Sequence, residues 1–313
     1  MKIGVVGGGW GRAHCWAFRE AGCSVEVIVT RDAERASEIA RLEGVLLGTA
    51  SLSALDSMDV VVIATPASTH LELIRRFNDK AVLCEKPLAG TSWVEGGLDG
   101  IARRHKAVNY AFSFLDTSRA LRAWVESGRA GHISRVAVHV GARFAGQRTP
   151  VEWFMDIAVH PLSFLQTMFG CFSLNQFCVD ERGVHLSMSQ PGRSLEVRYR
   201  ELLEEGIDVE VALEGERGWA RMAGRYRSGR PWVFEPLWID GAAQGCGEGG
   251  AEDVWARANA RSVRGFVELV HGRVNKDQAA GSGLFDLDAA AQIERSLAPI
   301  FASLGVEGEG VEG

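Results

Sequence analysis

The sequence predicts an α/β domain with a parallel sheet, followed by an α+β domain with a large, mostly antiparallel open sheet. Up to about residue 112, short apolar runs alternate with segments of helical periodicity, which is typical of a parallel sheet covered on both faces. Beyond that point, strand-like segments follow one another without intervening helices, as in an antiparallel sheet. We therefore expect two domains, residues 1–112 and 113–304, and a disordered tail at 305–313.

The elements of the first domain follow from their apolar patterns. The strands are short apolar runs rich in β-branched residues, and the helix at 33–43 carries Ala36, Ile39 and Ala40 on one face. We expect strands at residues 3–6, 24–30, 60–64, 81–84 and 107–111, and helices at 11–21, 33–43, 69–77 and 91–105.

The second domain is expected to begin with a helix at 116–127, which Gly128 ends. Turn residues separate the later strands, and a glycine-rich loop is expected at 241–250. The last helix is able to pack back on the first domain. We expect strands at residues 133–142, 175–179, 184–188, 195–199, 209–213 and 219–222, and further helices at 155–169, 253–270 and 287–304.

Composition excludes several classes of protein. The chain of 313 residues has a net charge of −6 without a basic block, so nucleic acid is not an expected partner. No apolar run is long enough to cross a bilayer, and no secretory signal precedes the first strand. The six cysteines form no CxxC pair, so we expect reduced thiols, no metal site and a cytoplasmic protein.

A glycine-rich turn, Gly7-Gly8-Gly9-Trp10-Gly11, follows the first strand and opens the first helix. Glycines in this position let backbone N–H groups approach a pyrophosphate at a helix N-terminus. The spacing is one residue shorter than GxGxxG. It predicts a dinucleotide site that includes Gly7, Gly9, Trp10 and Gly11.

The end of the second strand indicates which dinucleotide is bound. A site for NAD requires a carboxylate there for the ribose 2′-hydroxyl, whereas this chain has Thr30-Arg31. A hydroxyl and a guanidinium suit a 2′-phosphate, so NADP(H) is the preferred cofactor and NAD(H) remains possible. Asp32 is either the ribose carboxylate or the cap of the helix that begins at Ala33.

Glu85-Lys86-Pro87 follows the strand at 81–84 and therefore lies at the carboxyl edge of the sheet, where open α/β sheets bind ligands. The chain has five lysines and 29 arginines. A lysine at this edge suggests chemistry that a guanidinium cannot perform, such as giving up a proton.

These motifs, with Ala64-Thr65-Pro66, His70 and the D-x-x-x-H pattern of Asp156 and His160, resemble the glucose–fructose oxidoreductase/inositol dehydrogenase/rhizopine-catabolism (Gfo/Idh/MocA) oxidoreductase family. The resemblance covers most of the chain and is strongest up to residue 170. It implies a Rossmann domain followed by an α+β domain whose open sheet takes part in subunit contacts. A homodimer or homotetramer is therefore implied.

The resemblance also implies roles for individual residues. Ala64, Thr65 and Pro66 would line the cofactor, and His70 would lie near the nicotinamide. Glu85 and Lys86 would bracket the nicotinamide ribose, and Lys86 would also reach the substrate oxygen.

Asp156 and His160 would face Lys86 across the cleft. Their i, i+4 spacing puts both on one face of a helix, where the carboxylate can orient the imidazole. His160 is the first candidate for proton transfer. Pro161 would disturb the helix, which could then begin near His160 and weaken this interpretation.

Three further residues are candidates for substrate binding. Tyr110 ends the strand at 107–111, Arg143 follows the long strand at 133–142, and Trp153 stands near the position where many relatives carry a glycine pair. Bulky Trp153 would reshape the substrate pocket.

The predicted function is an NADP(H)-dependent oxidoreductase that moves a hydride between the nicotinamide and a C=O/C–OH carbon of a sugar, polyol or nucleotide-linked keto-sugar. Lys86 and His160 would transfer the proton. Two alternatives remain: an imine (C=N) reductase of a biosynthetic pathway, and a non-catalytic regulator that binds NADP.

Overall fold

The computed structural model describes residues 1–93, 95–144, 148–181, 183–245 and 253–303. These residues form two compact units. The first unit comprises residues 1–111 and 256–295, and the second comprises residues 112–255 and the described residues from 296 on. The predicted tail at 305–313 and part of the predicted loop at 241–250 lie outside the described residues.

The first unit is built on a seven-stranded sheet whose strand order reverses between β1 and β4. In an open α/β sheet, ligands bind outside the carboxyl ends of the strands at such a reversal. β16 is antiparallel to β6, and the other pairs are parallel. The order is β3 (Leu47–Thr49), β2 (Val25–Val29), β1 (Ile3–Val6), β4 (Val60–Ile63), β5 (Ala81–Glu85), β6 (Lys106–Asn109) and β16 (Phe285–Asp286).

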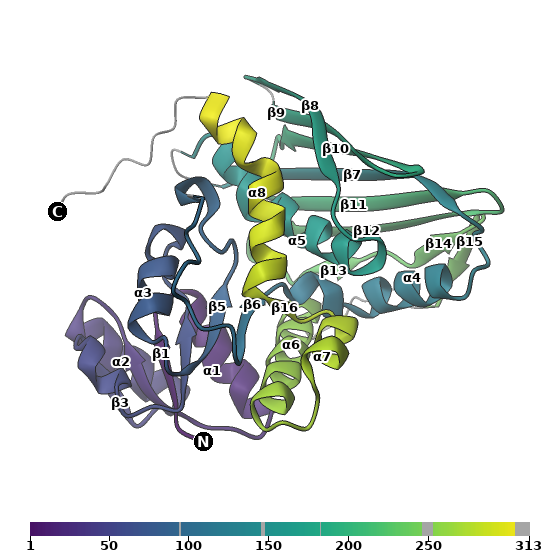
Figure 1. The fold of residues 1–313 in the computed structure, drawn as a ribbon. Helices are drawn as coiled ribbons and strands as arrows, with labels where there is room; N and C mark the ends of the chain where they lie inside the picture. The colour runs from purple at the N-terminus through teal and green to yellow at the C-terminus, as the bar shows by residue number, and fades with distance from the viewer. Residues whose placement is uncertain (94, 145–147, 182, 246–252, 304–313) are drawn as a thin grey trace. The chain divides into compact units, whose positions relative to one another are not determined.

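Helices of the first unit lie beside this sheet (Figure 1). Ile3, Val5, Phe18 and Ile28 are buried without exposed surface, which shows that α1 packs on the central strands. Helices α6 and α8 belong in large part to the first unit. The helices are α1 (Trp10–Glu20), α2 (Ala33–Glu43), α3 (His70–Arg76), α6 (Val254–Val270), α7 (Lys276–Ser282) and α8 (Leu287–Ser303), with 3₁₀ turns at Leu52–Leu55, Ala67–Thr69 and Gly90–Ser92.

The predicted helix at 91–105 is wrong. The described residues of this segment form only the end of the 3₁₀ turn at Gly90–Ser92, followed by turns and irregular backbone. Gly96 and Gly100 adopt φ values of 75° and 73°, in the left-handed region that a right-handed helix excludes. Glycine is also a poor helix former, and this segment contains several glycines.

The second unit contains a nine-stranded sheet that is antiparallel except for the pair β7 and β10. The predicted fold class, a Rossmann domain plus a domain with a mostly antiparallel sheet, is confirmed. The order is β15 (Ala242–Gln244), β14 (Leu237–Ile239), β12 (Trp219–Arg227), β11 (Gly206–Gly215), β7 (Ile133–Arg143), β10 (Arg193–Glu201), β9 (Gly183–Gln190) and β8 (Ser173–Asp180), and β13 (Val233–Phe234) pairs with β12.

The large sheet has one buried face and one polar face. Val136, Val138 and Val140 of β7 are buried, whereas His139 between them is exposed, as the alternation of a strand requires. Helices α4 (Asp116–Glu126) and α5 (Pro150–Phe169) lie along the buried face (Figure 1). A 3₁₀ turn at Ala111–Phe114 precedes α4.

Helix α5 begins at Pro150 and continues through Pro161 to Phe169, so a start near His160 is excluded. A capping box fixes its beginning: the Thr149 hydroxyl accepts from the Glu152 N–H, and the Glu152 carboxylate accepts from the Thr149 N–H. Pro161 has no N–H to donate, yet the flanking turns remain helical. Asp156 and His160 therefore lie one turn apart on the same helix.

Candidate functional site

The glycine turn brings the carboxyl ends of β1 and β4 close together. Gly7 has φ 113°, and a Cβ there would lie 2.1 Å from the carbonyl oxygen of Ala64. A Cβ on Gly11 would lie 3.0 Å from Val5 Cγ1, so this glycine lets α1 pack closely on β1. Gly9 caps α1 without a side-chain hydrogen bond. The first N–H groups of α1 are thus suited to an anion such as a pyrophosphate.

The end of β2 resolves the two roles considered for Asp32. Its Oδ1 accepts from the N–H groups of Glu34 at 2.8 Å and Arg35 at 3.1 Å, so Asp32 is the cap of α2. Thr30 Oγ1 donates to the Asp32 carbonyl oxygen at 2.6 Å. Arg31 is exposed at the same turn, next to the glycine turn in the sheet order.

His70 connects the loops that follow β4 and β5. Its Nε2 lies 2.8 Å from the Thr65 carbonyl oxygen, and its Nδ1 lies 3.0 Å from the Pro87 carbonyl oxygen. Burial lowers the pKa of His70, although these carbonyl groups oppose the change. The ring therefore fixes the two loops relative to each other, and its approach to the nicotinamide stays a prediction.

Glu85 lies in a buried polar network that the sequence did not reveal. One oxygen, Oε1, lies 2.7 Å from His14 Nε2 and accepts from Asn109 Nδ2 at 2.8 Å. Asn109 also donates to Asn259 Oδ1 of α6 at 2.7 Å. The signal was present in part, because His14 follows the glycine turn by less than one helical turn and Asn109 ends a buried strand.

Burial alone would raise the pKa of Glu85. The hydrogen bond and charge of His14, the Asn109 amide and the Lys86 ammonium outweigh it and lower this pKa to about 2. The Glu85 side chain is therefore an ionised anchor, and its other oxygen, Oε2, accepts from the Lys86 N–H at 3.3 Å. This network fixes the backbone at the residue that carries the candidate catalytic amine.

The candidate residues of the second unit gather around α5. Asp156 Oδ2 lies 3.0 Å from Arg148 Nη1, and the Arg148 guanidinium lies 4.7 Å from the centre of the Trp153 ring. His160 is buried, and its ring meets Trp255 edge to face with 4.9 Å between ring centres. The carboxylate that we expected to orient His160 thus has an ion pair with Arg148.

A row of aromatic rings extends from Trp255 in this unit. Trp255 stacks on Trp232 at 5.1 Å, Trp232 contacts Tyr226 at 5.7 Å, and Tyr226 contacts Phe144 at 6.1 Å. Phe144 contacts Trp153 at 5.2 Å. The surroundings of Asp156 and His160 are therefore strongly aromatic.

Tyr110 and Arg143 differ in their environments. Tyr110 is buried in the first unit, where its ring meets Phe285 edge to face at 5.1 Å, and burial raises its pKa well above the ordinary value. Arg143 is exposed at the end of β7 and donates to the Leu202 carbonyl oxygen at 3.3 Å. Of these two candidates, Tyr110 is a core residue and Arg143 is exposed.

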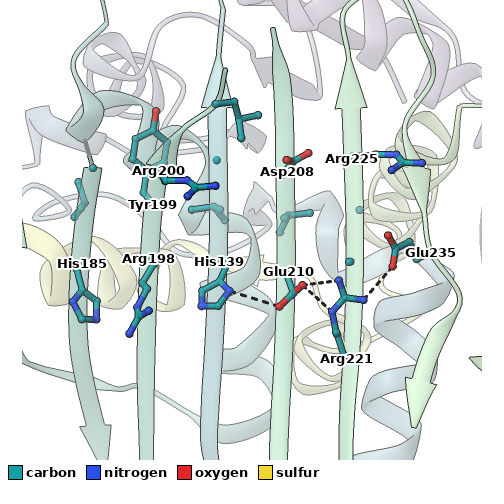
Figure 2. Close-up of a pocket in the computed structure, with 18 of the residues that line it drawn as sticks. His139, His185, Arg198, Tyr199, Arg200, Asp208, Glu210, Arg221, Arg225 and Glu235 are labelled. Atoms are coloured by element: carbon teal, nitrogen blue, oxygen red, sulfur yellow. Dashed lines mark hydrogen bonds and ion pairs between the residues drawn. The ribbon is translucent and has the colours of Figure 1, made fainter. Parts of the chain in front are cut away.

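The polar face of the large sheet forms a hollow of about 840 Å³ (Figure 2). Glu210 lies at its centre, 2.7 Å from Arg221 and 3.6 Å from His139, and Arg221 also pairs with Glu235 at 3.1 Å. His185 and Arg198 continue the row across β9 and β10 (Figure 2). The hollow is therefore rich in charges of both signs.

Within the described ranges, His, Cys, Asp and Glu side chains form no group of three or more that could hold a metal ion. None of the helices in the described part of the chain is both long and apolar enough to cross a membrane.

The strand order, the glycine turn and a start of α1 that lacks a side-chain cap define a protein with an NAD(P)-binding Rossmann fold. Residues 1–107 match the model of a family described as an oxidoreductase family with an NAD-binding Rossmann fold. The resemblance to this family that the motifs predicted is therefore confirmed over residues 1–107.

Two curated relatives agree with this match. The chain is 38% identical over 99 residues to an inositol 2-dehydrogenase of Rubrobacter xylanophilus, covering 29% of this chain and 28% of the relative. It is 26% identical over 186 residues to an inositol 2-dehydrogenase of Rhizobium meliloti, covering 54% of this chain and 55% of the relative. The alignments thus span about half or less of the curated relatives.

A solved structure covers nearly all of the fold. GenD2 from gentamicin A biosynthesis, in complex with NAD, superposes with a TM-score of 0.74 at 18% identity, over 97% of this chain and 94% of that one. At this level of identity the likeness shows the fold, which includes both units.

Proposed function

We propose that the protein is an NADP(H)-dependent oxidoreductase that transfers a hydride between the nicotinamide and a C=O/C–OH carbon of a sugar, polyol or nucleotide-linked keto-sugar. One observation carries this proposal above the others. Lys86 follows β5 at the carboxyl edge of the same sheet as the glycine turn, and the buried Glu85 network fixes its backbone. The family match of residues 1–107 and the names of the two inositol 2-dehydrogenases support it.

The residues of the first unit would hold the dinucleotide at this edge. Gly7, Gly9, Trp10 and Gly11 would receive the pyrophosphate on the first N–H groups of α1. Ala64, Thr65 and Pro66 would line the cofactor after β4. The nicotinamide, when bound, supplies the hydride.

The protein must then move a proton to or from the reacting oxygen. Lys86 would donate a hydrogen bond to that oxygen and share its proton, and His160 would act as general acid or base. Asp156 would act with Arg148, since the ion pair holds the Asp156 carboxylate in place one turn from His160 on α5. Trp153 and Arg143 are the remaining candidates for substrate contact.

The preference for NADP(H) depends on Arg31. In Arg31→Ala we expect the Kd for NADPH to rise about 10- to 100-fold, because charge-assisted hydrogen bonds to the 2′-phosphate contribute about 1.5–3 kcal/mol. The Kd for NADH should change less than about twofold, since NADH lacks this phosphate. Fluorescence titration with both cofactors measures the two values.

Arg35→Ala is the matched control for Arg31→Ala. Arg35 is an exposed arginine in the first turn of α2, paired with Glu38 at 3.0 Å, so its loss should leave both affinities unchanged. Equal weakening of NADPH and NADH by Arg31→Ala would rule out the role in 2′-phosphate binding.

A second candidate function is the reduction of a C=N bond in a biosynthetic pathway. The row of Trp255, Trp232, Tyr226, Phe144 and Trp153 supports it, because a flat, conjugated imine can stack on aromatic rings. Incubation with NADPH and a panel of keto-sugars and cyclic imines decides between them. Cofactor binding without turnover of any compound would favour a regulator instead.

We also propose that the protein is a homodimer or homotetramer and that the polar face of the large sheet lies between subunits. A two-fold interface repeats one patch on both sides, and the mixed charges around Glu210 and Arg198 allow self-complementary pairing. Light scattering should give a mass of two or four chains, and Arg198→Glu should lower it. A mass of one chain for the wild type would contradict this assignment.

A further inference from the structure

Glu294 of α8 is a buried carboxyl group that the proposed chemistry does not use. It has no exposed surface, and its Oε2 accepts from the N–H groups of Ala89 at 2.9 Å and Gly90 at 2.7 Å. Ala89 lies 205 residues earlier in the chain. Placing a carboxyl group in the core is costly unless hydrogen bonds compensate for the lost water, and here the donors are two consecutive backbone amides.

These amides belong to the loop that carries Lys86. The loop is held at its start by the hydrogen bond from the Lys86 N–H to Glu85 Oε2, at 3.3 Å. His70 Nδ1 lies 3.0 Å from the Pro87 carbonyl oxygen in the middle of the loop. Glu294, from the carboxyl-terminal part of the first unit, accepts from the N–H groups at the end of the loop.

The shape of the loop suits this contact. Gly90 has φ 58°, in the left-handed region, and a Cβ there would lie 3.1 Å from Pro87 Cγ. Ala89, with φ −141° and ψ −18°, directs its own N–H and that of Gly90 to the same side, where both donate to one carboxylate oxygen. Glu294 therefore supplies the acceptor for two buried backbone N–H groups that lie beyond the end of β5.

We propose that Glu294 is a positioning residue that clamps residues 88–90 and thereby fixes Lys86 at the carboxyl edge of the sheet. Its effect on turnover rests on the role of Lys86 in the proposed function, whereas the clamp itself does not. The C-terminal helix would then belong to the active-site architecture and not only to the packing of the fold.

The strength of the clamp should depend on whether Glu294 is ionised. Burial raises the pKa of Glu294 and the N–H groups of Ala89, Gly90 and Leu88 lower it, with a net value of about 7. Two titratable groups, Tyr110 and Cys84, feel its charge, and both have pKa values raised well above the ordinary ones, so they are neutral near pH 7. Because the N–H groups favour the ionised form, the clamp should tighten as pH rises through about 7.

Hydrogen exchange of the amides at 88–90 tests the clamp without any need for turnover. In Glu294→Ala these amides should exchange roughly 10- to 100-fold faster than in the wild type. Glu294→Gln keeps an acceptor oxygen but no charge, so it should retain part of the protection. After correction for intrinsic exchange, wild-type protection should increase between pH 6 and pH 8, and that of Glu294→Gln should stay constant.

Turnover of the same variants tests the consequence for Lys86. We expect Glu294→Ala to lower kcat roughly tenfold or more with a Kd for NADPH within about twofold of the wild type, and Glu294→Gln to recover most of kcat. Asp288→Asn is the matched control, since Asp288 is an exposed carboxylate of the same helix paired with Arg103 at 2.9 Å. It should leave both exchange and kcat unchanged.

The possible failures are distinguishable. Wild-type exchange at 88–90 in both Glu294 variants would overturn the clamp. Faster exchange with unchanged kcat in Glu294→Ala would overturn the positioning of Lys86. If Glu294→Ala does not fold, Glu294→Gln alone decides through its exchange and its pH profile. A wild type that binds no dinucleotide would refute the proposed function, and the exchange result would stand.

Discussion

Replacing Lys86 with methionine is expected to lower kcat by about 10²- to 10⁴-fold and to change the Kd for NADPH by less than about threefold, since positioned proton transfer contributes a factor of this size. Methionine keeps an unbranched chain of similar length but cannot polarise the reacting oxygen or give up a proton. The backbone at Lys86 should stay in place, because Glu85, His70 and Glu294 hold the loop through main-chain groups. Steady-state kinetics with a substrate from the panel measures kcat.

Two further variants sharpen this test. Lys86→Arg should restore little activity, because the guanidinium keeps the positive charge and does not release its proton near neutral pH. Lys80→Met is the control, since Lys80 lies just before β5 and its ammonium is 3.8 Å from Asp79. A Lys86→Met variant with kcat within tenfold of the wild type would remove Lys86 from the chemistry.

Glu85→Gln is expected to destabilise the protein by roughly 3 kcal/mol near pH 7, which is the free energy equivalent of the fall of the Glu85 pKa from 4.5 to about 2. The sign follows from the lowered value. The ionised network stabilises the fold fully above the ordinary carboxyl pKa, and this stabilisation is lost as pH falls from about 4.5 towards 2.

Urea unfolding at two pH values measures this effect. The difference between the wild type and Glu85→Gln should shrink to about half between pH 7 and pH 3. Glu38→Gln serves as the control because Glu38 forms an exposed pair with Arg35, and such pairs contribute about 0–1 kcal/mol. A difference that does not change with pH would show that Glu85 is not the ionised anchor of the network.

Periodicity and motifs predicted much of the first unit. The buried runs at β1, β4 and β5 were recognisable because each begins with four consecutive residues without charge or polar side chain and precedes a turn or helix signal. The prediction of a helix at 91–105 was wrong because it followed the apolar spacing and neglected the glycines. Two of these glycines, Gly96 and Gly100, adopt a left-handed conformation that ends a helix. The return of β16 to β6 was not predictable, because a two-residue strand carries no periodic signal.

The candidate site was predictable where a motif is local. The glycine turn and Glu85-Lys86-Pro87 have fixed spacings that a single sequence displays. The side-chain partners of Glu85 come from α1 and β6, and Asn259 of α6 joins the network through Asn109. Glu294 reaches the Lys86 loop from α8. No spacing rule relates such distant residues, so only the fold reveals that they meet. The pairing of Asp156 with Arg148 depends on the loop before α5 in the same way.

A structure of the protein with bound NADPH tests the central claim most directly. We expect the pyrophosphate at the start of α1 beside Gly7–Gly11, the 2′-phosphate at Arg31, and the nicotinamide ribose next to Lys86. Crystals saturated with NADPH in which this edge of the sheet is empty, or in which the Lys86 amine points away from the nicotinamide, would contradict the account.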